Sequence, residues 1–206
     1  MARILAVSSQ VARGHVGLSA MVPALHALGH EVIALPTVIL SNHPGHAASA
    51  GQRIEPDVLE AMTGALAANG WLDEVSAVVT GYLPTADHVR FAAALVDRLK
   101  ASHGVLYLCD PVLGDEETGL YLDPLAAGML RSDLTGRADI LTPNRFEAGW
   151  LTGTRPETLR QLIDETAPLA RQRIVAITSA ERSAGRIANI FLRGDARLAA
   201  TVEWRH

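Results

Sequence analysis

Short apolar runs recur along the chain and alternate with longer segments in which apolar residues return every three or four positions. The short runs are rich in Val, Ile and Leu and lack a polar residue at every second position. This pattern is typical of strands that are buried on both faces of a parallel sheet. It predicts six strands, over residues 4–7, 31–35, 75–80, 105–109, 138–141 and 174–178.

The longer segments have the apolar spacing of helices that pack through one face. They cover residues 18–28, 56–68, 86–100, 123–130, 143–151 and 156–170, and several open at a proline, which suits the first turn of a helix. Strands that alternate with helices indicate βαβ units. We therefore expect a layered α/β fold with a mostly parallel central sheet and helices on both faces.

The last part of the chain departs from this alternation. Residues 185–192 and 197–204 are two β-like runs joined by Arg193-Gly194-Asp195-Ala196, which predicts a late β-hairpin. No internal repeat or linker interrupts the sequence, so we expect one domain over residues 1–206. Because a hairpin is an unusual end for a βαβ array, we expect the C-terminal part of that domain to be missing.

The composition narrows the class of protein. Hydrophobic residues make up 49% of the chain and charged residues 19%, and the net charge is −4, which excludes intrinsic disorder. The lack of a Lys/Arg run argues against nucleic acid as a partner. No apolar run is long enough to predict a membrane span or a signal peptide. The one cysteine, Cys109, suits a reducing compartment, so a soluble cytoplasmic protein is expected.

Polar, Gly or Pro residues follow every predicted strand. Since ligands of open parallel sheets bind beyond the carboxyl ends of the strands, these positions form the candidate site. The segment from Ser9 to Gly17 has backbone N–H groups that could face an anion, although an ordinary loop fits the same residues. The segment from Asn42 onward holds His43 and His46, which suit a turn or a ligand-covering loop better than a metal site.

Carboxylates and hydroxyls follow the later strands. Asp110 and Asp115 flank Pro-Val-Leu-Gly; they could hold Mg²⁺ together with phosphate oxygens, and they could equally cap a turn and face solvent. Thr142 could cap the helix that follows it. Asn144 and Glu147 would then lie three residues apart on one helical face, either as capping groups or aimed at a metal-bound phosphate.

Thr178 and Ser179 follow the sixth predicted strand and suit a phosphate or a ribose, although strand ends often carry such residues.

Together these segments resemble the pyridoxal kinase branch of the ribokinase superfamily. Two of the motifs, Asp-Pro-Val-Leu-Gly-Asp at residues 110–115 and Thr-Pro-Asn-x-x-Glu at residues 142–147, are shared with the related hydroxymethylpyrimidine kinases. The matching stretches are Ser9…Gly14-His15-x-Gly17-x-Ser19-Ala20, Thr37-Val38-x-x-Ser41-Asn42-His43, Gly81-Tyr82-Leu83, Asp110-Pro111-Val112-Leu113-Gly114-Asp115, and Leu141-Thr142-Pro143-Asn144-x-Phe146-Glu147 with Leu151-Thr152-Gly153.

The resemblance implies a ribokinase-like fold and transfer of a phosphoryl group from ATP, with Mg²⁺, to the 5′-hydroxyl of pyridoxal or a related vitamin B6 vitamer. The alternatives are a hydroxymethylpyrimidine kinase or an inactive relative that binds B6 vitamers or nucleotide. A monovalent cation such as K⁺ and a homodimer are also implied. By matching position, the implied residues are Ser9, Tyr82, His43 and His46 for the substrate, Asn144, Thr178, Ser179 and Asp115 for the nucleotide, and Asp110, Thr142 and Glu147 for the metal.

The sequence departs from the family pattern at three points. Leu18 and Pro44 stand where members of the family commonly have Asn and Thr. The family's Gly-x-Gly-Asp motif, which carries the catalytic Asp, occurs nowhere in the sequence and would follow His206. No catalytic residue is therefore assigned, and we expect this chain alone to phosphorylate pyridoxal far more slowly than a complete member, or not at all.

Overall fold

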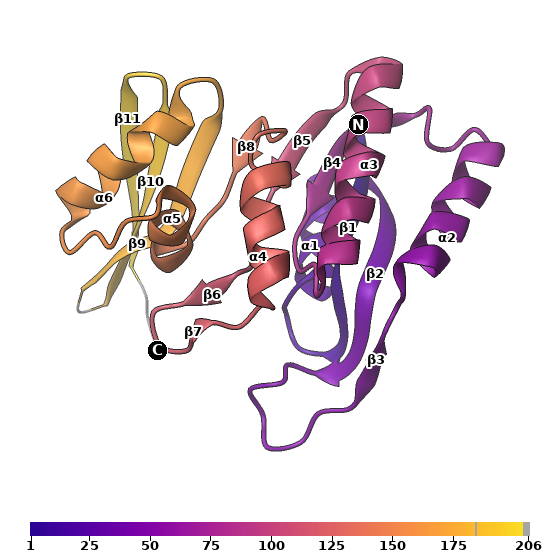
Figure 1. Ribbon diagram of the computed structural model, residues 1–206, viewed down its shortest axis with the longest axis horizontal. Coiled ribbons are helices and arrows are strands. Elements are labelled where there is room, and N and C mark those ends of the chain that lie inside the picture. The colour runs from indigo at the N-terminus through magenta and orange to yellow at the C-terminus, as the bar shows by residue number, and fades with distance from the viewer. Residues whose placement is uncertain (184, 204–206) are drawn as a thin grey trace.

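The computed structural model describes residues 1–183 and 185–203, and its main element is a nine-stranded sheet with the order β11-β10-β9-β8-β5-β4-β1-β2-β3 (Figure 1). The neighbouring strands from β9 to β2 pair in parallel, so their carboxyl ends lie at one edge of the sheet. The strands are β1 Arg3–Arg13, β2 Glu31–Asn42, β3 Gly51–Arg53, β4 Val75–Thr80, β5 Leu106–Cys109, β8 Ile140–Leu141, β9 Ile174–Ser183, β10 Arg186–Arg193 and β11 Ala196–Glu203.

The central parallel strands carry the core because their side chains are apolar on both faces. Leu5 and Val7 of β1 and Val78 of β4 are fully buried. Tyr107 of β5 is also fully buried, and its hydroxyl lies 2.7 Å from the hydroxyl of Thr80. Apolar burial of this kind stabilises the fold, while the paired hydroxyls satisfy the polar atoms that it encloses.

Helices join the parallel strands. The N-terminus of α3 is capped by Thr85, whose hydroxyl accepts from the backbone N–H of His88, and the helix ends at Gly104, which has a left-handed φ of 70°. Helix α3 packs against both α2 and α4. The helices are α1 Leu18–Ala27, α2 Pro56–Ala68, α3 Ala86–His103, α4 Pro124–Met129, continued by a π-helical turn Leu130–Leu134, α5 Arg145–Thr152, and α6 Leu159–Thr166, continued by a 3₁₀ turn Ala167–Ala170.

The structure confirms the predicted α/β class, the mostly parallel sheet and the late hairpin, and it corrects several local expectations. Strands β1 and β2 run on to Arg13 and Asn42, so Ser9 lies within β1 and not after it. The short edge strand β3 and the small hairpin of β6 (Gly114–Asp115) and β7 (Gly119–Leu120) were not predicted, because two or three residues are too few to show a period. Trp204, the last residue of the predicted hairpin, lies outside the described residues.

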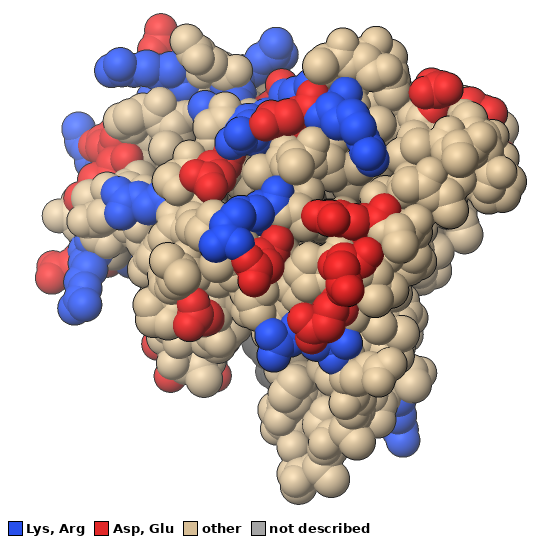
Figure 2. Space-filling model, turned by 45° about the vertical axis from the view of Figure 1, so that its right-hand side comes forward, with Lys and Arg blue, Asp and Glu red and all other residues tan. Residues whose placement is uncertain are grey.

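Charged side chains of both signs are interspersed on the face shown in Figure 2, and that face carries no continuous basic patch. Among the described residues, no helix combines the length and the apolar character that crossing a membrane requires.

Candidate active site

Backbone hydrogen bonds join the carboxyl ends of the central strands, and these bonds bring the predicted polar residues to one edge. The N–H of Asp110 donates to the carbonyl of Thr80 at the end of β4 (2.8 Å), and the N–H of Thr142 donates to that of Cys109 at the end of β5 (3.1 Å). Further along, the N–H of Thr178 donates to the carbonyl of Pro143 (2.8 Å). Asp110 and Thr142 therefore follow the ends of β5 and β8, as the sequence predicted. Thr178 and Ser179 lie beside them but within β9, which runs on to Ser183, so the predicted strand end at residue 178 was wrong.

Asp110 supplies a carboxylate that is largely removed from water. The Thr142 hydroxyl donates to its Oδ1 atom at 3.2 Å. Burial raises the pKa of Asp110 to about 6, and the Thr142 hydrogen bond opposes that rise. A desolvated carboxylate with a single hydroxyl donor favours a nearby cation, because the cation would stabilise the ionised form.

Glu147 and Asn144 form the capping box at the start of α5. The Asn144 side chain accepts from the N–H of Glu147 (2.9 Å), and Oε2 of Glu147 accepts from the N–H of Asn144 (2.8 Å). The expectation that Thr142 caps this helix was therefore wrong. Asn144, and not Thr142, has the capping-box spacing to Glu147, so the helix begins at Arg145.

The second oxygen of Glu147 holds the loop after β5. Oε1 accepts from the N–H of Leu113 at 2.8 Å, and the Glu147 side chain is almost completely buried. Burial raises the pKa of Glu147 to about 7; the negative charge of Asp110 adds to the rise, and backbone N–H donors oppose it. Both oxygens thus accept from backbone groups, and a metal-binding role for Glu147 stays a prediction.

Asn144 also bridges α5 to the β6–β7 hairpin. Its Nδ2 atom donates to the carbonyl of Gly114 at 2.8 Å, and its backbone pairs with Thr178 in an isolated parallel bridge. Asp115, the next residue of that hairpin, closes a tight turn by accepting from the N–H groups of Glu117 and Thr118. The hydrogen bonds from Thr118 hold the pKa of Asp115 below its ordinary value.

Two residues at this edge have a backbone conformation that L-amino acids rarely adopt. Val112 has a φ of 43° and Ser179 a φ of 50°. The N–H of Ser179 donates to the Asn189 side chain (3.0 Å), and Arg145 donates to the carbonyl of the next residue, Ala180 (3.3 Å). Such strain concentrates at functional sites. Sequence reasoning missed Val112, because a β-branched residue gives no signal for a positive φ.

The predicted substrate residues Ser9 and Tyr82 lie nearer the β1–β4 side of the edge. The start of α1 packs directly on Ser9, since a Cβ atom on Gly17 would lie 2.3 Å from the Ser9 hydroxyl oxygen. The N–H of Tyr82 donates to the hydroxyl of Ser8 at 3.1 Å. Partial burial raises the pKa of Tyr82, and the positive charge of Arg53 opposes that rise.

His43 and His46 lie on the exposed segment between β2 and β3. Nδ1 of His43 accepts from the N–H of Gly45 at 3.1 Å, so this ring stabilises its own turn. A surface cavity of about 540 Å³ opens at the base of the segment, lined by Arg13, Gly14, Ser41, Asn42, His46 and Ala48. This lining includes His46 but neither Ser9 nor Tyr82. A substrate site shared by these residues stays a prediction.

The described residues contain no group of three or more His, Cys, Asp or Glu side chains placed to hold a metal ion. An ion at Asp110 would therefore need further oxygen ligands, such as the phosphate oxygens that Mg²⁺ commonly shares with one or two carboxylates. The desolvated Asp110 carboxylate fits such an ion, and the neighbouring Thr142 hydroxyl is a second oxygen at the same edge.

Comparison with known proteins gives consistent matches. The model of the phosphomethylpyrimidine kinase family matches residues 13–202. Pyridoxal kinase PdxY of Leifsonia xyli subsp. xyli is 40% identical over 185 residues, which are 87% of this chain and 65% of the relative. Pyridoxal kinase PdxY of Deinococcus radiodurans is 36% identical over 187 residues, which are 87% and 63% of the two chains. The chain thus spans just under two thirds of these curated relatives.

Two solved structures have the same fold over nearly the whole chain. Pyridoxal kinase from Leishmania donovani, in complex with ADP and pyridoxine, is similar with a TM-score of 0.88 and 30% identity, covering 99% of this chain and 72% of that one. Pyridoxal kinase from Entamoeba histolytica is similar with a TM-score of 0.90 and 25% identity, covering 100% of this chain and 75% of that one.

Proposed function

The chain belongs to the phosphomethylpyrimidine kinase family, and from that premise we propose that the protein is an ATP-dependent kinase for the 5′-hydroxyl of pyridoxal and related B6 vitamers. The observation that carries the proposal is the linked strand-end cluster of Asp110, Thr142 and Glu147. It lies at the edge where open parallel sheets bind ligands. Likeness to a pyridoxal kinase in complex with ADP and pyridoxine supports the choice of substrates.

The nucleotide is proposed to lie along the β8–β9 side of this edge. We assign Asn144, Thr178, Ser179 and Asp115 to its binding. Asn144 and Thr178 are held together by their backbone bridge, and Ser179 is fixed through Asn189. A rigid set of polar groups suits phosphoryl transfer, since that reaction depends on positioning and on stabilising phosphate charge.

Asp110, Thr142 and Glu147 are assigned to the metal and phosphate region. When bound, Mg²⁺ supplies positive charge that neutralises the phosphate oxygens. Asp110 would hold it through a carboxylate already shielded from water, with Thr142 beside it. Glu147 would act mainly by fixing the loop that begins at Asp110, since both of its oxygens accept from backbone N–H groups.

The acceptor vitamer is assigned to Ser9, Tyr82, His43 and His46. The half-buried Tyr82 offers an aromatic surface, and Ser9 of β1 offers a hydroxyl that lies against Gly17, just before α1. The two histidines lie on an exposed segment that could cover a ligand. No catalytic base is assigned among these residues.

A hydroxymethylpyrimidine is the second candidate acceptor, because the matching family model is described by a pyrimidine substrate. Both acceptors are small aromatic rings with a hydroxymethyl group, so the same strand-end edge would serve either. We further propose that the protein is a single-domain homodimer that uses K⁺ as a second cation. It would work in the cytoplasm, where its free and buried Cys109 would stay reduced.

Ligand-dependent melting tests the proposal and separates the two acceptors. A ligand that binds only the native state stabilises it. Pyridoxal with a Mg²⁺–nucleotide is expected to raise the melting temperature more than hydroxymethylpyrimidine with the same nucleotide. A larger rise with the pyrimidine would favour the second candidate. No rise with either acceptor or with nucleotide would contradict both.

A further inference from the structure

His88 is a fully buried imidazole near the start of α3, and both of its ring nitrogens have partners. Nε2 lies 2.9 Å from the carbonyl oxygen of Ile54, and Nδ1 lies 2.8 Å from the hydroxyl of Thr85. Because a carbonyl can only accept, Nε2 carries the proton and Nδ1 accepts from Thr85. Burial holds the pKa of His88 below its ordinary value; Arg53 acts in the same direction, while the Ile54 carbonyl and Glu55 oppose it.

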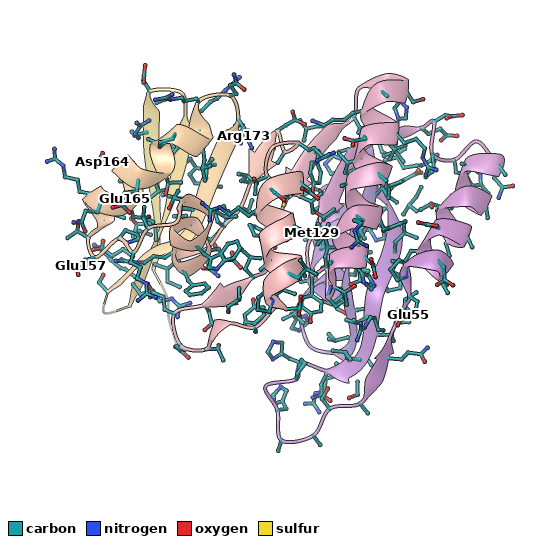
Figure 3. All side chains as sticks on the ribbon, viewed as in Figure 1. Glu55, Met129, Glu157, Asp164, Glu165 and Arg173 are labelled. Atoms are coloured by element: carbon teal, nitrogen blue, oxygen red, sulfur yellow. The ribbon has the colours of Figure 1, made fainter. Side chains whose placement is uncertain are left out.

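Ile54 lies between β3 and α2. Strand β3 follows segment 43–50, which carries His43 and His46. Figure 3 shows the next residue, Glu55, where the chain passes from β3 into α2. The N–H of Ile54 donates to the carbonyl of Thr37 in β2 at 2.9 Å. These two bonds attach Ile54 to α3 through His88 and to the sheet through Thr37.

The same hydrogen bonds continue to Tyr82. The hydroxyl of the fully buried Thr37 donates to the carbonyl of Tyr82 at 2.7 Å. From Tyr82 the backbone runs through Leu83 and Pro84 to Thr85, the partner of Nδ1. These hydrogen bonds and the backbone from Tyr82 to Thr85 thus form a closed hydrogen-bonded ring, whose members are His88, Ile54, Thr37, Tyr82 and Thr85. His88 joins the two ends of this hydrogen-bonded ring.

We propose that His88 is a positioning residue for the acceptor side of the site. Through Ile54 and Thr37 it fixes the base of segment 43–50 relative to Tyr82. Filling the core would need no imidazole, since an apolar side chain of similar size avoids the cost of burying two polar nitrogens. The assignment to the acceptor rests on the proposed function, whereas the ring can be tested without it.

Two substitutions separate the two bonds of His88. His88→Gln keeps an amide donor near the position of Nε2 and so can retain the bond to Ile54. His88→Asn keeps a polar atom near Nδ1, beside Thr85, and loses the bond to Ile54. The matched control is His103→Asn at the far end of the same helix, where Nε2 bonds to the carbonyl of Val75 at 2.8 Å.

The test measures ligand binding by titration calorimetry, below the melting temperature of every variant. We expect His88→Asn to raise the Kd for pyridoxal about five- to tenfold, the loss that one net hydrogen bond represents. The Kd for ADP should stay within about twofold of the wild-type value, and His88→Gln should restore most of the pyridoxal affinity. His103→Asn should change neither Kd. Equal pyridoxal binding by His88→Asn and the wild type would overturn the proposal, as would equal losses for pyridoxal and ADP.

Amide hydrogen exchange provides a readout that does not depend on the proposed function. His88→Asn should speed exchange at Ile54 and Tyr82, whose N–H groups belong to or adjoin the ring, and leave Leu113 unchanged. If the wild type binds no vitamer, the proposed function fails, and exchange alone then decides whether the ring exists. Unchanged exchange at Ile54 in His88→Asn would overturn the inference in either case.

Discussion

Glu147 and Leu113 are 34 residues apart in the sequence, yet Oε1 of Glu147 accepts the backbone N–H of Leu113 at 2.8 Å. The bond ties the start of α5 to the loop after β5. Since the other oxygen of Glu147 holds Asn144, one carboxylate fixes two segments of the candidate site. The loop that begins at Asp110 is thereby placed before any ligand arrives.

Removal of that carboxylate should loosen the loop. Glu147→Ala leaves the N–H groups of Leu113 and Asn144 without their acceptor, and we expect the free energy of unfolding to fall by about 1–3 kcal/mol. Urea denaturation measures the loss, and faster amide exchange at Leu113 locates it. Glu117→Ala, on the exposed β6–β7 turn, is the control and should stay within about 0.5 kcal/mol of the wild type. A stable Glu147→Ala protein with a protected Leu113 amide would contradict this role.

The partly buried Asp110 carboxylate should make stability depend on pH. Its folded-state pKa of about 6 lies above the ordinary value, so between about pH 4 and pH 6 the folded state binds more protons than the unfolded chain. Stability from this group is therefore present at low pH and is lost as the pH rises through 6.

Asp110→Asn removes that titration and keeps an acceptor for Thr142. Relative to the wild type, the variant should gain about 1–3 kcal/mol in free energy of unfolding between pH 5 and pH 8. Denaturation curves at the two pH values measure the gain. A constant difference between the two proteins across this range would show that Asp110 is not desolvated as described.

At the strained position Val112, a glycine variant should be more stable than an alanine variant, which is the reverse of the usual order of stability. Glycine accepts a φ of 43° freely, whereas alanine keeps the Cβ atom that causes the strain. Val112→Gly is therefore expected to be more stable than Val112→Ala by about 1 kcal/mol. The same pair at Val78, in regular strand β4, should show the ordinary order with alanine more stable. If both sites show alanine more stable, the strain at Val112 is absent.

The two capping boxes allow local stability to be separated from nucleotide binding. Asn144→Ala and Thr158→Ala each remove an N-cap and should each cost about 1–2 kcal/mol of stability. Of the two, Asn144 alone also donates from its side-chain amide to the carbonyl of Gly114, so its variant should weaken ADP binding and Thr158→Ala should not. Calorimetric titration with ADP decides, and equal effects of both variants would assign Asn144 a purely structural role.

Periodicity predicted the central sheet well, because strands buried on both faces leave an uninterrupted apolar run. Strand β4 was predicted with both of its bounds, Val75 and Thr80. Strands β1 and β2 run past the predicted ends, because Gln10 and Arg13 continue the same ladder beyond an irregularity at Ser9. Ladder pairing overrides residue polarity there, and a single sequence does not show which residues pair.

The sequence predicted the candidate site as a set of residues that follow strands, but it did not predict which of these residues hydrogen-bond to one another. The spacing of Asn144 and Glu147 is that of a capping box and could have corrected the choice of Thr142 as the cap. The bond from Glu147 to Leu113 had no such signal, since it joins segments that only the folded sheet brings together. The same reason hid His88, whose partner Ile54 is distant in the sequence.

Product analysis tests the central claim most directly. The protein, purified from the cells that make it, is mixed with MgATP and pyridoxal at equal protein and pyridoxal concentrations, so that even slow transfer is detected. Mass spectrometry should find pyridoxal 5′-phosphate and ADP formed in equal amounts, and Asp110→Asn should form both far more slowly. Phosphorylation of hydroxymethylpyrimidine without that of pyridoxal, or no phosphorylated product while both ligands bind, would contradict the account.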